Sequence, residues 1–216
     1  MLQRTTFLVL VLVTVSACSR YGNLEDDLLR QSLWVHQQAA AAEVTQWNLY
    51  ARAALKIEEG SYSIGIRWQR YENGRFMMLL EAPFGQGVLR IDALGPEKFR
   101  LRLPDGRLFV NNTVEALMKD VVGWSLPFSG LDYWVRGIPH PDGDYRHRLN
   151  SAGLAKSIRQ DGWVIAYLDY FAEAGELSLP RRLKITNETA TLKLVIERWQ
   201  QAPVDASDAD LFPSFD

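Results

Sequence analysis

The stretch Phe76-Met-Met-Leu-Leu-Glu-Ala-Pro-Phe-Gly-Gln-Gly-Val-Leu-Arg-Ile-Asp92 indicates two strands separated by a tight turn. The run Phe76–Leu80 is apolar at every position, which is typical of a strand that is covered on both faces. Pro83 and Gly85 break this run, and the chain then resumes as a strand. Phe84 stands between the two breakers, where turns usually carry a polar residue. From its position alone, Phe84 either packs on a neighbouring segment or is exposed to a partner or a membrane.

The composition of the 216-residue chain is ordinary for a folded domain, with 47% hydrophobic and 23% charged residues. This length favours a single domain with a sizeable core. The formal net charge is −2 and the basic residues are spread along the chain, so nothing indicates a nucleic-acid partner. Seven Trp, eight Tyr and nine Phe suit either a large core or an apolar binding surface.

The first 17 residues have the pattern of a signal peptide. Arg4 supplies the positive charge, and the apolar run Phe7–Val15 is shorter than the roughly 20 residues that span a bilayer. Two small residues, Ser16 and Ala17, then precede Cys18, the single cysteine of the chain. This order resembles the lipobox of bacterial lipoproteins. An ordinary signal peptide followed by an incidental cysteine is the alternative.

The lipobox resemblance implies a lipid anchor at Cys18. Diacylglycerol would be attached to the thiol, the chain would be cleaved before Cys18, and the new amine would be acylated. Such an anchor is firm, because each buried CH₂ contributes about 0.8 kcal/mol. Ser19 follows the cysteine. By the sorting rule usual for such lipoproteins, a residue other than Asp at this position implies the outer membrane. We therefore expect a signal peptide at 1–17, a lipidated tether at 18–23, a folded domain at 24–201 and a flexible tail at 202–216.

Regular hydrophobic patterns predict one long helix followed by strands. The helix is expected over Leu24–Gln46, with an apolar stripe of Leu24, Leu28, Leu33 and Val44. From Trp47 the apolar residues alternate with period two, and Asn73-Gly74 and Asp105-Gly106 are strong hairpin signals. Six strands up to Val110 therefore form an antiparallel meander, and four more follow between Ser157 and Trp199.

Two short helices are expected between these groups of strands. Asn112 is predicted to cap the first, with Glu115 completing a capping box. Ser129 is predicted to cap the second, over Gly130–Arg136, which Gly137 and the following proline end. The segment His140–Gly153 is rich in Pro, Gly and Asp, which predicts a loop.

The sequence carries no recognisable catalytic motif, cofactor motif or metal motif. None of the three histidines, His36, His140 and His147, stands in a hydrolase or metalloenzyme pattern. His140 and His147 lie near Asp142 and Asp144, which leaves a weak metal site as an alternative to a solvated loop. We therefore predict no catalytic residue, no resident metal and no cofactor.

Several landmarks recur in the order that is found in a known family. They are Trp68-Gln69, Leu79–Gly85, Leu131-Asp-Tyr-Trp-Val-Arg-Gly-Ile-Pro139, Gln160-Asp-Gly-Trp-Val-Ile-Ala-Tyr167, Leu179-Pro180 and the strand Lys193–Trp199. Behind a lipobox, this ordered combination resembles the LolB family, the outer-membrane lipoprotein receptors of Gram-negative bacteria. The landmarks extend over most of the chain beyond Cys18.

The resemblance implies a fold, a task and a set of partners. The fold would be an open, curved antiparallel sheet, an incomplete β-barrel, with an α-helical lid over an apolar cavity. The protein would receive lipoproteins from a LolA-like periplasmic carrier and insert their acyl chains among outer-membrane phospholipids, acting as a monomer without catalysis. Residues expected to line the cavity are Ile64, Ile66, Trp68, Met78, Leu80, Leu101, Leu131, Trp134 and Trp163.

The turn Pro83-Phe84-Gly85 matches the protruding membrane-insertion loop of that family, in which Leu is usual at the Phe84 position. Two other classes of function stay open at this stage. A structural scaffold lipoprotein would have a filled core in place of a lipid cavity, and binding of a fluorescent fatty-acid probe would distinguish the two. A lipid hydrolase is the third class, and it is weakened by the missing catalytic triad.

Overall fold

The computed structural model describes residues 24–82, 87–171 and 177–200. The predictions for Cys18, for the loop Pro83-Phe84-Gly85 and for the tail at 202–216 lie outside these residues. Among the described residues, no helix is both long and apolar enough to cross a membrane.

Within the described residues, eleven strands form one antiparallel sheet. The strands are β1 Trp47–Ile57, β2 Gly60–Arg70, β3 Phe76–Glu81, β4 Val88–Gly95, β5 Lys98–Arg102, β6 Leu108–Asn111, β7 Tyr145–Leu149, β8 Ala155–Gln160, β9 Trp163–Tyr170, β10 Pro180–Thr186 and β11 Thr191–Gln200. The order across the sheet is β6-β5-β4-β3-β2-β1-β11-β10-β9-β8-β7. The sheet stays open, with β6 and β7 at its ends, which confirms the predicted fold class.

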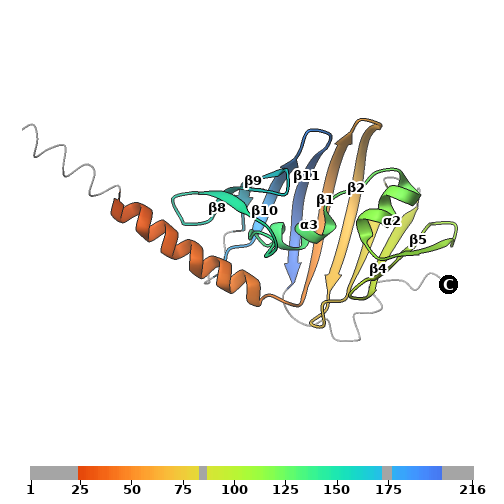
Figure 1. Cartoon of the computed structure of the whole chain (residues 1–216), viewed down its shortest axis with the longest axis horizontal. Coiled ribbons are helices and arrows are strands. Elements are labelled where there is room, and N and C mark those ends of the chain that lie inside the picture. The colour runs from red at the N-terminus through yellow and green to blue at the C-terminus, as the bar shows by residue number, and fades with distance from the viewer. Residues whose placement is uncertain (1–23, 83–86, 172–176, 201–216) are drawn as a thin grey trace, which may run out of the picture.

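Two meanders meet at the centre of this sheet. The first runs from β1 to β6 and the second from β7 to β11, and β1 pairs with β11 between them. The helices α2 (Val114–Val122) and α3 (Phe128–Trp134) connect the meanders and lie over one face of the sheet (Figure 1). Because side chains alternate along a strand, the apolar set of each strand faces these helices. The charged set, including Arg52 and Lys56, faces away.

The N-terminal helix, over residues 24–43, packs with a different face from the one that its leucines predict. Leu24 and Leu28 are 60% and 71% exposed, whereas Trp34, Gln37 and Ala41 are buried. Trp34 stacks on His147 of β7, with ring centroids 5.2 Å apart. Gln37 is polar but is buried on this face, where its side-chain amide donates to the backbone oxygen of Ser178 at 2.7 Å. The predicted stripe was therefore wrong for its leucines, whereas Val44, directly after the helix, packs against the core.

Both predicted helix caps are also wrong. Thr113, not Asn112, caps α2, and its hydroxyl accepts from the backbone N–H of Ala116 at 3.1 Å. Pro127 precedes α3, and Ser129 lies inside the first turn. The carboxylate of Glu115 accepts from the backbone N–H and hydroxyl of Ser129, at 3.1 and 3.3 Å, so it joins the two helices and forms no capping box.

The predicted loop His140–Gly153 contains strand β7 at Tyr145–Leu149. Three of its five side chains are arginine or histidine, so the strand shows no apolar alternation. It lies at the end of the sheet and pairs only with β8. Charged side chains are common on such edge strands because they discourage pairing with other chains.

Candidate functional site

A small cavity lies between the helices and the centre of the sheet, and every residue that lines it is apolar. Its volume is about 40 Å³. The floor comes from β1, β2, β3 and β11, and the roof comes from α3 and the segment that joins it to α2. The site is therefore built across the junction of the two meanders.

The register of the strands explains why the cavity forms at this place. Ala53 of β1 lies between Ile64 of β2 and Leu194 of β11, and all three side chains point to the helices. A methyl group between two larger side chains leaves a hollow in the floor, because interiors are otherwise closely packed. On the neighbouring strands, Ile66 pairs with Leu80 across β2 and β3.

Six of the nine residues predicted for the cavity line it in the structure. They are Ile64, Ile66, Trp68, Met78, Leu80 and Leu131. Leu101 is fully buried but lies further along the sheet, between Ile91 and Phe109. Trp163 lines a separate open groove beside the β8–β9 turn. Leu101 and Trp163 therefore do not line this cavity, and the acyl-binding role of the predicted residues remains a prediction.

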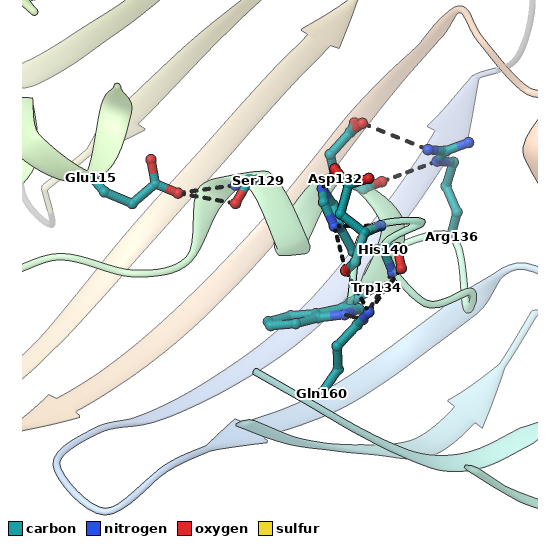
Figure 2. A network of polar contacts seen from close by, with 8 residues as sticks. Glu115, Ser129, Asp132, Trp134, Arg136, His140 and Gln160 are labelled. Carbon is teal, nitrogen blue, oxygen red and sulfur yellow. Dashed lines mark hydrogen bonds and ion pairs between the residues drawn. The ribbon is translucent and has the colours of Figure 1, made fainter. Parts of the chain in front are cut away.

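Trp134 was also misplaced, because it is a fixed structural residue beside the cavity. Its indole Nε1 donates to the side-chain oxygen of Gln160 at 3.1 Å (Figure 2). Its backbone oxygen accepts from the hydroxyl of Tyr167 at 3.1 Å. Gly130 lies against the indole ring so closely that an added Cβ would approach it to 2.6 Å. Only glycine fits there, and the tryptophan is held on several sides.

Eight lining residues were not predicted. They are Leu49, Ala53, Leu192 and Leu194 on the central strands, and Trp124, Leu126, Phe128 and Val135 in the helical region. The alternation in β1 and β11 places the first four on one face of each strand. The pairing of β1 with β11, which brings them together, has no local signal in the sequence.

A charged network lies at the end of α3, beside the cavity. The carboxylate of Asp132 accepts from Arg70 at 2.8 Å and lies 3.6 Å from Arg136. Arg136 also donates to the backbone oxygens of Ala41 and Val44, at 3.0 and 3.3 Å, and so binds the end of the N-terminal helix to α3. Burial raises the pKa of Asp132, and the two arginines oppose that rise.

A second, larger recess adjoins the cavity, and we call it the polar groove. It has a volume of about 960 Å³ and lies at the end of the sheet that carries the β2–β3 and β4–β5 turns. Its walls include Phe76, Phe99 and Tyr133. Arg70 and Asp132 also line it. Trp68 and Phe128 line both the groove and the cavity, so the two are direct neighbours.

The loop histidines make ordinary structural contacts. The ring Nδ1 of His140 lies 3.2 Å from the backbone N–H of Asp142, and the His140 backbone N–H donates to Gln160 at 2.9 Å. His147 stacks on Trp34. In the part of the chain that the structure describes, no three His, Cys, Asp or Glu side chains gather in an arrangement that could hold a metal ion.

These features define a class of protein: an open antiparallel sheet with helices over an apolar cavity, suited to an apolar ligand. The family described as "Outer membrane lipoprotein LolB" matches residues 45–199. The outer-membrane lipoprotein LolB of Chromohalobacter salexigens is 36% identical over 195 residues, which cover 90% of this chain and 89% of that protein. The LolB of Thiobacillus denitrificans is 37% identical over 157 residues, 73% of this chain and 81% of that one.

The chain therefore belongs to the LolB family of outer-membrane lipoproteins. This confirms the family that the ordered motifs indicated. Among solved structures, the LolA superfamily protein NE2245 from Nitrosomonas europaea aligns with a TM-score of 0.49 and 12% identity, over 82% of this chain and 96% of that chain.

Proposed function

We propose that the protein receives lipoproteins from a soluble LolA-like carrier in the periplasm and passes their acyl chains to outer-membrane phospholipids. The observation that carries this proposal is the wholly apolar cavity between sheet and helices in a member of the LolB family. Apolar walls suit acyl chains because burial of each CH₂ contributes about 0.8 kcal/mol and needs no directional contact.

The cavity must widen when an acyl chain enters. Its volume of about 40 Å³ is far below that of pockets for small molecules, which are roughly 300–1,000 Å³. The roof segment between α2 and α3, which contains Trp124 and Leu126, is neither helix nor strand. It touches the floor through apolar contacts, which have no fixed geometry. This segment is the part of the roof that we expect to move.

The proposed transfer needs no enzyme chemistry and no second copy of the protein. Acyl chains move between apolar environments without a change in any covalent bond. The direction follows from a final environment that buries more CH₂ groups than the cavity does, which is the bilayer. We propose that the lipid anchor at Cys18 keeps the protein at that bilayer throughout.

The membrane-facing step is assigned to Phe84 by the family resemblance. Burial of a phenylalanine side chain contributes roughly 1.5–3 kcal/mol, which favours contact with the bilayer but is too little to anchor a protein. Receipt and delivery should therefore be separable. Receipt depends on the cavity, and delivery depends on the turn at Phe84.

The test is a two-stage assay with purified carrier, protein and liposomes. Phe84→Glu should receive lipoprotein from the carrier at the normal rate and deliver at least tenfold less of it to liposomes, because a carboxylate opposes entry into the bilayer. Phe84→Leu is the matched control and should deliver almost as well as the native chain. Normal delivery by Phe84→Glu, or a defect limited to receipt, would contradict the assignment.

A further inference from the structure

We propose that the inner end of the polar groove binds the amide and ester groups that join the acyl chains of a cargo lipoprotein to its N-terminal cysteine. This inference rests on the proposed function, since it concerns the same cargo. It adds a polar subsite with a defined chemical preference to the apolar cavity.

The first argument is that the cavity and the groove are direct neighbours. Trp68 and Phe128 form the border at which the cavity ends and the groove begins. A ligand with its chains in the cavity must place its polar head at this border, because the cavity walls offer it no hydrogen bond. The groove, at about 960 Å³, has room for the head and for the first residues of a peptide.

The second argument is the supply of free polar atoms at this border. Trp68 Nε1, Arg70 Nε and Asp132 Oδ1 are buried and have no hydrogen-bond partner within the described residues. Asp132 as a whole is 7% exposed. Buried polar atoms are nearly always paired in proteins. Trp34 Nε1 and Trp47 Nε1 are also unpaired within the described residues, but the other three atoms belong to residues that line one groove and include both members of an ion pair.

The third argument is the match between these atoms and one kind of ligand. The border offers two N–H donors, on Trp68 and Arg70, and one carboxylate acceptor, on Asp132. A secondary amide supplies one acceptor and one donor, and an ester supplies a further acceptor. A cysteine modified as predicted for Cys18 carries an N-acyl amide and ester carbonyls side by side, and cargo lipoproteins carry the same modification.

This set of atoms also disfavours other lipids. A free fatty acid brings a carboxylate, which can accept from Arg70 but has no proton to donate to Asp132 Oδ1. A fatty ester can accept from the two donors but leaves Asp132 Oδ1 without a partner. The amide is the group that satisfies both sides of the Arg70–Asp132 pair, whose charged atoms lie 2.8 Å apart.

The walls of the groove extend the site away from the border. Phe76 follows Trp68, with ring centroids 6.0 Å apart, and Phe99 follows Phe76 at 6.1 Å. This row of rings leads from β2 towards β5 over the inner face of the sheet. It offers an apolar surface to the residues that follow the modified cysteine, whatever their sequence.

The experiment compares two fluorescent probes that differ in one atom. One is a dansyl-labelled N-palmitoyl dipeptide, and the other is its analogue with an ester in place of the N-palmitoyl amide. The mature chain, residues 18–216 with Cys18→Ala, lacks both the signal peptide and the acyl anchor, so its binding of the probes can be measured without detergent. We expect the amide probe to bind about tenfold more tightly, because the ester leaves a buried acceptor unpaired.

Two arginine variants locate the effect. Arg70→Gln removes the guanidinium Nε donor and the charge that pairs with Asp132, and it should weaken the binding of the amide probe about fivefold. Arg75→Gln removes the same charge from the exposed rim of the groove and should leave the affinity unchanged. Thermal unfolding of both variants establishes that they are folded. If Arg70→Gln is unstable, the polar subsite is tested by the difference in affinity between the two probes for the Cys18→Ala chain.

The outcomes separate the inference from the proposed function. Tight and equal binding of both probes would overturn the polar subsite and leave the acyl cavity intact. Binding of neither probe would overturn the proposed function as well. A loss of affinity in Arg75→Gln equal to that in Arg70→Gln would show a general charge effect and would also overturn the subsite.

Discussion

The two sides of the helical layer are held to the sheet by different forces. Over β8 and β9, the contacts are hydrogen bonds: Gln160 binds the backbone of His140 through both of its amide atoms, at 2.9 and 2.8 Å, and Trp134 through its oxygen. Over β1, β2 and β3, the residues that line the cavity under the helical region are all apolar, and Trp68 Nε1 has no partner among the described residues; the ion pair between Arg70 and Asp132, at the end of β2, is the polar contact on this side. We call these the bonded side and the apolar side.

This difference indicates which side of the helical layer can change its conformation. Hydrogen bonds have narrow limits of distance and angle, so the bonded side has one geometry. Apolar contacts tolerate rearrangement at nearly constant buried area. Burial also raises the pKa of Tyr167 and Tyr170, which keeps both hydroxyl groups protonated as donors on the bonded side. The ligand space is therefore expected where the helical region is free to lift, with the opposite side as its fixed support.

The largest expected effect is on the bonded side. Trp134→Ala removes a fully buried ring and leaves Gln160 short of a donor, so the free energy of unfolding should fall by about 3–5 kcal/mol. Trp124→Ala, on the apolar side, removes a partly buried ring of the same size and should cost about 1 kcal/mol. Urea unfolding measures both. Equal losses would show that the two sides do not differ in this way.

A smaller effect is expected from filling the hollow in the cavity floor. Ala53→Phe places a ring between Ile64 and Leu194, so it should weaken binding of an acyl probe at least tenfold and cost about 1–3 kcal/mol of stability. Ala54→Phe adds the same ring to the exposed face of the same strand and should leave binding unchanged. Probe titration checks this pair. If Ala53→Phe bound the probe normally, the acyl chain would lie elsewhere.

The smallest effect concerns the contact between the N-terminal helix and β7. Burial lowers the pKa of His147, so the folded protein binds this proton less tightly than the unfolded chain does. The neutral ring therefore supports the fold above the unfolded value of about 6.5, and that support is lost as the pH falls through the lower, folded pKa.

Unfolding at pH 7.5 and pH 5 measures this dependence. His147→Gln should lose less stability between the two pH values than the native chain does. His36→Gln, on the exposed side of the N-terminal helix, should behave like the native chain. A pH dependence that is the same with and without His147 would contradict the assignment.

Strands with strong local signals could be predicted from the sequence. Period-two alternation and the turns at Asn73-Gly74 and Asp105-Gly106 located β1 to β6 within a few residues of their observed ends. The same alternation assigned Ile64, Ile66 and Trp68 to one face. What local patterns could not give was β7, since its arginines and histidine reflect an edge position that depends on the whole sheet.

The candidate site was predictable only in part, for a similar reason. Leu101 and Trp134 are as apolar as the residues that line the cavity. The alternation of apolar residues in the sequence predicts that a side chain is buried, but it does not predict which residues surround that side chain. The polar partner of Trp134 is Gln160, on a different strand. The choice of Thr113 over Asn112 as the cap rests on backbone angles, because both residue types cap helices well.

The pairing of the first strand with the last also governs the order of folding. Each meander is assembled from neighbouring hairpins, which form early because their loops are short. The ladder between them joins Lys56 to Thr191 and must wait until nearly the whole domain is available. Until then β1 is an unpaired edge, and Arg52 and Lys56 place positive charges along it. The strand at the centre of the finished sheet thus carries protection that it needs only while the chain is incomplete.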